Sequence, residues 1–139
     1  MTPATLNTLA NLPSIRDKVA PGHRDIDLTT FFDHPDNVAL GDQDGVVLFG
    51  HHGAGVYEMH YLMGPDVRGR AALTRLRAAL KTMFTEHGAT AIVGDTPDAF
   101  LSARVINRAL GGVPTARTTD DLGRPCTTYK LERQTWACC

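Results

Sequence analysis

The sequence predicts an α+β domain in which helices flank a mixed, mostly antiparallel central sheet. Short apolar runs separated by turn residues occupy residues 38–63, which is typical of antiparallel strands. A long stretch of helical periodicity then precedes one short apolar run, which indicates a crossover between parallel strands. Two further runs near the C-terminus are expected to complete the sheet.

Short helices are expected within the first 35 residues. Apolar residues recur at three- and four-residue steps over residues 6–19, which indicates one or two short helices, with Pro13 beginning a turn of its own. A further short helix is expected over residues 27–32, ended by Pro35. This region shows no clear first strand.

Three strands should follow. The apolar runs 38–40 and 46–49 flank an Asp-Gly pair, which favours a hairpin. Residues 50–55, which include His51 and His52, are expected to form a second turn. Residues 56–63 then form the third strand, ended by a Gly-Pro pair.

The second half alternates helix and strand. A helix is expected from Arg68 or Gly69 to His87, capped by Gly88, because its apolar residues form one stripe. That stripe consists of Ala72, Leu73, Leu76, Ala79, Leu80, Met83 and Phe84. A short buried strand should occupy residues 89–93.

The Thr96-Pro97 pair is typical of a helix start, so a second helix is expected from there to Leu110. Asp98 would then be a carboxylate in the first turn, where the helix dipole favours it. The last two strands are expected over residues 113–118 and 127–132.

Composition limits the function. The 139 residues and 15.0 kDa predict a single domain, 1–133, followed by a C-terminal tail, 134–139, that includes Cys138 and Cys139. Lys plus Arg number 14 and Asp plus Glu 15, so the near-neutral chain is not a general polyanion binder. The odd count of three cysteines favours a reducing compartment, and neither a secretory signal nor a membrane-spanning run is recognisable, so we expect a cytoplasmic protein.

The informative segment is the junction between the third strand and the long helix. A short Gly-containing loop opens this helix, so several backbone N–H groups and the positive end of the helix dipole should converge there. Arg68 and Arg70 add guanidinium groups that suit phosphate. The spacing predicts an anion site, although it is neither a P-loop nor a dinucleotide-binding fingerprint.

Here the sequence resembles the GNAT superfamily of acyl-CoA-dependent N-acyltransferases. The family motif, Gln/Arg-x-x-Gly-x-Gly/Ala, corresponds to residues 66–71, where Gly69 and Ala71 match and Asp66 replaces Gln or Arg. The helix that ends at Gly111-Gly112 resembles a second family feature, and the likeness covers residues 38–132. The residues Tyr57-Glu58-Met59-His60 followed by Arg68-Gly69 also resemble short GNAT-like proteins of bacteriophages.

The resemblance implies an N-acetyltransferase that uses acetyl-CoA or another acyl-CoA. No metal is expected, because no Cys or His spacing resembles a metal site. A primary amine of a small molecule, a protein or a modified nucleobase would attack the thioester directly in a ternary complex. A backbone N–H near Leu62 or Met63 would stabilise the oxyanion. A homodimer is also implied. The implied acyl-CoA contacts are Leu62, Met63, Val67, Arg68, Gly69, Arg70, Ala71 and Ala72.

Two residues of the third strand are candidate bases. Glu58 and His60 lie on one face of that strand, with Cα atoms about 6.5–7 Å apart. Either could accept the amine proton, but both are also common on solvated sheet faces.

No residue is an obvious candidate for the general acid that would protonate the departing thiolate. The position at which many family members have a tyrosine is Asn107, which cannot protonate a thiolate. Tyr129 could serve, or no acid is needed because a thiol has a pKa of about 8.5. Alternatively, catalysis has been lost.

Two rival functions remain open. The first is a catalytically inactive module that binds CoA or a protein, as a phage structural or regulatory component. The second is nucleic-acid binding through Arg68, Arg70, Arg75 and Arg77, which the 6% aromatic content disfavours. The long helix's Arg75, Arg77 and Lys81 are expected on a solvated face, or at a CoA 3′-phosphate. His51 and His52 match no metal-ligand spacing.

Overall fold

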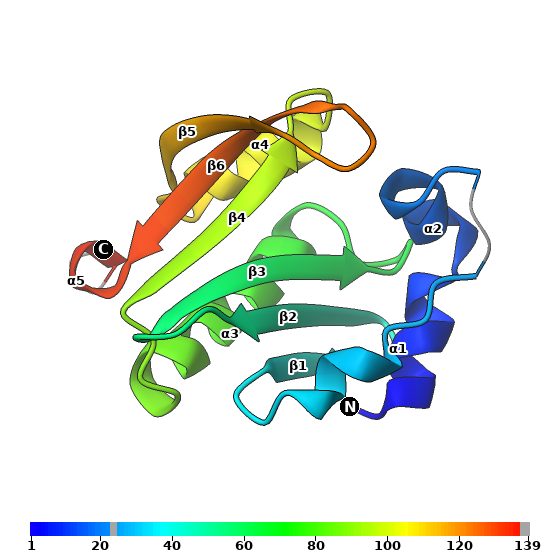
Figure 1. The fold of residues 1–139 in the computed structure, drawn as a ribbon, viewed down its shortest axis with the longest axis horizontal. Coiled ribbons are helices and arrows are strands. Elements are labelled where there is room, and N and C mark those ends of the chain that lie inside the picture. The colour runs from blue at the N-terminus through cyan, green and yellow to red at the C-terminus, as the bar shows by residue number, and fades with distance from the viewer. Residues whose placement is uncertain (23–24, 137–139) are drawn as a thin grey trace. The chain divides into compact units, whose positions relative to one another are not determined.

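The central feature of the fold is a six-stranded sheet. The structure, a computed structural model, describes residues 1–22 and 25–136. These residues form one sheet with the order β1-β2-β3-β4-β6-β5 (Figure 1). β3 and β4 pair in parallel, whereas the pairs β1–β2, β4–β6 and β5–β6 are antiparallel. The predicted α+β class with a mostly antiparallel sheet and flanking helices is confirmed.

The helices and strands follow one another along the chain in an order that begins with three helices and three strands. The elements are α1 (Pro3–Ala10), α2 (Pro13–Val19), the 3₁₀ helix η1 (Thr29–Asp33), β1 (Val38–Asp42), β2 (Gly45–His51), β3 (Val56–Met63), α3 (Arg70–Glu86), β4 (Ala91–Pro97), α4 (Leu101–Ala109), β5 (Val113–Thr119), β6 (Pro125–Glu132) and α5 (Arg133–Trp136). None of the helices in the described part of the chain is long and apolar enough to cross a bilayer.

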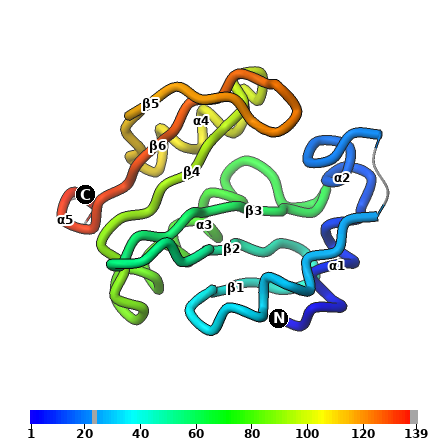
Figure 2. The backbone as a smooth tube through the Cα atoms, in the orientation of Figure 1, coloured from blue at the N-terminus to red at the C-terminus, as the bar shows by residue number. Residues whose placement is uncertain are grey.

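The chain divides into two compact units. The first unit contains Met1–His51 and His60–Ala79, and the second contains His52–Met59 and the residues from Leu80 onward. The boundaries therefore fall within β3 and within α3. The backbone can be followed through both units in Figure 2.

The core of the first unit lies between its N-terminal helices and its strands. Pro3 and Pro13 each occupy the first turn of a helix, so two helices form, as the periodicity allowed. Their apolar residues pack with β2 and β3, and each fully buried leucine contributes about 1.5–3 kcal/mol. This cluster consists of Leu6, Leu9, Ala10, Ile15, Val46, Leu48 and Leu62.

Asn7 of α1 and Asn11, the C-cap of this helix, hold the segment that precedes η1. The amide of Asn11 accepts a hydrogen bond from Ile26 N (2.6 Å) and donates one to Ile26 O (2.7 Å). Asn7 accepts from Leu28 N (2.7 Å) in the same way, one turn earlier in the helix. The helix expected over residues 27–32 is instead the 3₁₀ helix η1, shifted by two residues at its start.

The second unit is organised around β4. Residues Val56–Glu58 of β3 pair with Ala91–Val93, and β4 pairs along its whole length with β6. The end of α3 places Leu80, Met83 and Phe84 in the interior, as its apolar stripe predicted. The tail begins as the short helix α5, whose Trp136 lies 5.4 Å from the Phe84 ring. Cys138 and Cys139 lie outside the described residues.

The expected helix start at Thr96-Pro97 is wrong. Both residues belong to β4 and pair with Thr127 and Cys126 of β6, and α4 begins only at Leu101. Proline fits the last position of this strand as well as the first turn of a helix, so the dipeptide alone could not distinguish them.

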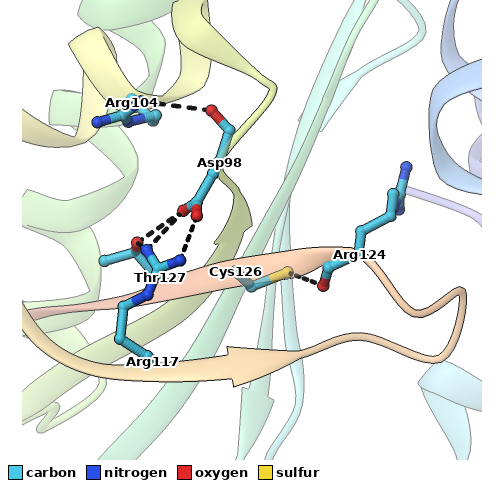
Figure 3. A network of polar contacts seen from close by, with 6 residues as sticks. All are labelled: Asp98, Arg104, Arg117, Arg124, Cys126 and Thr127. Atoms are coloured by element: carbon cyan, nitrogen blue, oxygen red, sulfur yellow. Dashed lines mark hydrogen bonds and ion pairs between the residues drawn. The ribbon is translucent and has the colours of Figure 1, made fainter.

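Asp98 is consequently not a first-turn carboxylate, and it joins the β4–α4 connection to the β5–β6 hairpin. Its carboxylate accepts hydrogen bonds from Arg117 Nη1 (3.0 Å) and Thr127 Oγ1 (2.8 Å), while Arg104 donates to its main-chain oxygen (3.4 Å) (Figure 3). The hydrogen bonds from Arg117, and then from Thr127, hold the pKa of Asp98 below its usual range.

β5 forms one edge of the sheet and is exposed at every residue. It carries Pro114, and its register against β6 shifts between Pro114 and Ala116. Proline cannot donate a ladder hydrogen bond, so this position is suited to an edge strand.

The Asp98 network predicts a pH-dependent contribution to stability. Because the folded-state pKa lies below the unfolded value, the contribution is present at neutral pH and is lost as pH falls through the folded pKa, below about 4. Asp98→Asn should therefore lower the unfolding temperature at pH 7, and the difference from the wild type should narrow at pH 3. Thermal denaturation followed by circular dichroism measures both.

Asp121→Asn, in the exposed turn of the same hairpin, is the matched control and should change the unfolding temperature little at either pH. If Asp98→Asn lowers the unfolding temperature equally at pH 3 and pH 7, the charge of Asp98 does not stabilise the fold.

Candidate functional site

The loop between β3 and α3 is fixed by its own backbone. Gly64 N donates to Asp44 O (2.7 Å) in the β1–β2 turn, and Val67 N donates to Gly64 O (3.0 Å), which closes a tight turn. A side chain at Gly64 would meet the Asp44 main chain at 2.7 Å, so only glycine allows this approach. The loop therefore enters α3 along a defined path.

The first turn of α3 presents donors without acceptors. Gly69 has a φ of +55°, and an added Cβ there would meet no atom within 4 Å. Ala71 N donates to Arg68 O (3.2 Å), but within residues 1–22 and 25–136 no acceptor faces the backbone N–H groups of Arg68, Gly69, Arg70 or Ala72.

The electrostatics of this turn favour an anion. No acidic residue lies in the first turn of α3, and the exposed Arg68 and Arg70 add positive charge where the helix dipole is already positive. Several N–H donors around an open, electropositive position suit a phosphate group. The geometry and the charge of this turn are compatible with a bound anion, and which anion binds there stays a prediction.

The eight predicted acyl-CoA contacts differ in burial. Gly69, Ala71 and the two arginines are exposed, whereas the side chains of Leu62, Val67 and Ala72 are buried. Leu62 belongs to the core cluster with α1, and Met63 is half-buried. For the buried residues, only the backbone remains to bind a ligand.

The candidate base Glu58 contacts a residue to which the sequence had assigned no role. His52 Nε2 lies 3.0 Å from Glu58 Oε2, and both side chains are partly exposed. His52 immediately follows β2, and the turn that returns to β3 brings it opposite Glu58. A carboxylate and an imidazole at this distance can share or relay a proton.

The other three predicted catalytic residues have distinct surroundings. His60 is exposed on β3. Asn107, which is buried, donates from Nδ2 to Thr96 Oγ1 (2.8 Å) and so ties α4 to β4. Tyr129 is buried in β6 and pairs with Gly94 of β4.

Tyr61 was missed by the sequence analysis. Its hydroxyl is buried and has no hydrogen-bond partner within the described residues. Burial raises the pKa of Tyr61 to about 12, so the hydroxyl stays protonated at neutral pH. A buried O–H without an acceptor is costly, which makes this group a candidate donor to a bound molecule.

Arg75 does not lie on a simply solvated face as expected. Its Nη1 donates to Asp42 Oδ1 (3.0 Å) and lies 3.4 Å from Gly45 O, so it links α3 to the β1–β2 turn. The hydrogen bond from Arg75 lowers the pKa of Asp42. Arg77 and Lys81 are exposed.

Comparison with solved structures identifies the fold. A spermidine N-acetyltransferase variant from Vibrio cholerae superposes with a TM-score of 0.63 and 14% identity, over 72% of this chain and 66% of that one. RimJ from Mycobacterium smegmatis, in complex with CoA-disulfide, superposes with a TM-score of 0.60 and 17% identity, over 68% of this chain and 50% of that one. An uncharacterised protein from Bacillus halodurans superposes with a TM-score of 0.76 and 12% identity, over 96% of this chain and 80% of that one.

The fold is therefore that of the GNAT acetyltransferases. The chain spans about three fifths of the length of the acetyltransferases that it matches. No protein-family model and no curated protein matches the sequence.

The unpaired hydroxyl of Tyr61 predicts an unusual mutational effect. Tyr61→Phe removes a buried, unsatisfied donor and keeps the ring, so the unliganded protein should gain about 1 kcal/mol in free energy of unfolding. Urea denaturation measures this change. Tyr57→Phe, in the same strand at a residue that does have an interaction partner, is the control and should bring no gain. If Tyr61→Phe clearly lowers the free energy of unfolding, the hydroxyl has a hydrogen-bond partner in the free protein.

Proposed function

We propose that this chain is an N-acyltransferase that transfers an acetyl or related acyl group from acyl-CoA to a primary amine. The observation that carries the proposal is the set of backbone N–H groups of Arg68, Gly69, Arg70 and Ala72, which have no acceptor among the described residues, on a GNAT fold. These N–H groups and the guanidinium groups of Arg68 and Arg70 would bind the pyrophosphate. The open space at Gly69, where an added Cβ would meet no atom within 4 Å, fits this assignment because it leaves room for a ligand beside the donors.

Acyl-CoA supplies an acyl group activated as a thioester. The amine nitrogen attacks the thioester carbonyl carbon, the new C–N bond forms, and the C–S bond breaks. A backbone N–H near Leu62 or Met63 would stabilise the negative oxygen that develops on the carbonyl. The amine must lose a proton during this step, so a base is required.

Glu58 or His60 would accept that proton. The contact between Glu58 and His52 favours Glu58, because the imidazole orients the carboxylate and can pass the proton on to solvent. His60, which is exposed, is the alternative. In this scheme His52 is a positioning residue.

The departing thiolate needs no dedicated acid, because a thiol has a pKa of about 8.5. Asn107 is engaged with Thr96 and does not act as an acid. Tyr129 or Tyr61 could still supply a proton.

The engagement of Asn107 also favours a second candidate function, in which the chain binds acyl-CoA or CoA without turnover. Ligand binding without thiol release from any amine would distinguish this module from an enzyme.

Gly69→Glu tests the phosphate site. A carboxylate in front of the donors would repel a pyrophosphate, so acetyl-CoA affinity, measured by isothermal titration calorimetry, should fall by about hundredfold or more. Gly88→Glu is a closely matched control, since Gly88 also has a left-handed φ (+67°) and open space around an added Cβ. Both variants carry a backbone strain of about 1–2 kcal/mol, so only the location of the charge differs. Equal affinities would assign the pyrophosphate to another surface.

Removal of the base should reduce turnover more than affinity. We expect Glu58→Gln to lower kcat by about a hundredfold or more with little change in acetyl-CoA affinity if Glu58 is the base, and His60→Ala to do so if His60 is. Thiol release measures turnover with spermidine, a peptide with a free N-terminus and an aminoalkyl nucleoside as acceptors. Unchanged turnover in both variants would leave Glu58 and His60 as surface groups.

A further inference from the structure

Three metal-ligating side chains meet at the end of the first hairpin. They are His34 and Asp36, which follow η1, and His51, the last residue of β2. Each offers one ligand atom, and these atoms all lie within 4.8 Å of one another. Asp36 Oδ2 is 3.8 Å from His51 Nδ1, and the two imidazole rings are 5.8 Å apart between centroids.

The hairpin register brings these residues together. Val38 of β1 pairs with Phe49 of β2, so extending the antiparallel register by two residues places Asp36 opposite His51. His34 lies two residues before Asp36, on the other side of Pro35. The sequence shows no metal-binding motif here because the ligands come from segments that are separated by the whole hairpin.

Asn37 holds the loop against the strand. Its Oδ1 accepts a hydrogen bond from His51 N (2.8 Å), and its Nδ2 donates to Phe31 O (2.9 Å) in η1. The backbone of all three segments is therefore fixed before any ligand binds. This support reduces the conformational entropy that a metal site would otherwise have to overcome.

We propose that His34, Asp36 and His51 form a binding site for a divalent transition metal, with Zn²⁺ as the representative ion. Two imidazoles and one carboxylate are a donor set that suits Zn²⁺, and water would complete the coordination because His34 and Asp36 are exposed. His34 Nδ1 now accepts a hydrogen bond from Asp36 N (3.2 Å), and the metal would take the place of that donor.

Ligand atoms around a tetrahedral Zn²⁺ lie about 3.3 Å apart, so the three side chains must approach one another by about 1.5 Å at most. His34 and Asp36 are exposed, so their side chains have room to rotate toward His51. The bound metal would link the η1–β1 loop to β2 and stabilise the first unit.

Calorimetric titration of the untagged full chain with Zn²⁺ tests the proposal. All measurements use the Cys138→Ser/Cys139→Ser background, because adjacent thiols also bind Zn²⁺. The parent should bind one Zn²⁺ per chain with micromolar affinity and unfold at a higher temperature when Zn²⁺ is present. His34→Gln and Asp36→Asn should each lower the affinity by about tenfold or more and remove the thermal shift.

His87→Gln, at an exposed histidine beyond the end of α3, is the matched control and should bind Zn²⁺ as the parent does. Circular dichroism without metal shows whether each variant folds, and His34 and Asp36 are exposed enough for replacement to be tolerated. Visible absorption after Co²⁺ substitution reports coordination directly, without acyl-CoA. Absence of binding by the parent, or equal affinities in the parent and the two ligand variants, would overturn the proposal.

Discussion

Left-handed backbone at Gly69 is the constraint on which the β3–α3 junction depends. A residue with a Cβ adopts a φ of +55° only at a cost, and this conformation leads the chain into α3 with its first N–H groups lacking acceptors. Arg68 and Arg70 add cations where the helix dipole already repels them. Positive charge is thus concentrated at this junction, and a bound anion, as proposed above, would offset it.

Much of the fold could be predicted because its signals are local. The hairpin strands and α3 follow from apolar periodicity, and the buried Leu76, Leu80 and Met83 lie on the predicted stripe. The Thr96-Pro97 prediction failed because pairing with β6 outweighed a local helix-start signal. Pairing between β4 and β6 involves residues about 35 positions apart, and no window of local sequence contains that information.

The site was predictable to the same extent. The turn from Arg68 to Ala72 is continuous in sequence, so an anion site could be predicted there from the residues alone. The contact of His52 with Glu58 depends on the conformation of the turn between β2 and β3, and the burial of the Tyr61 hydroxyl depends on packing around β3. The spacing of residues in the sequence indicates neither of these features. The role of Asn107 was likewise decided by a tertiary partner, Thr96, which only the arrangement of α4 on β4 supplies.

The exposed strand at the border of the sheet has a consequence for association. An edge strand has unpaired N–H and C=O groups with which a strand of another molecule can pair, which is a route to aggregation. On β5 that route is obstructed, because Pro114 lacks the N–H that an incoming strand would need and the adjacent register shift distorts the spacing of the remaining groups. A foreign strand could therefore make fewer ladder hydrogen bonds along β5 than along an uninterrupted edge strand.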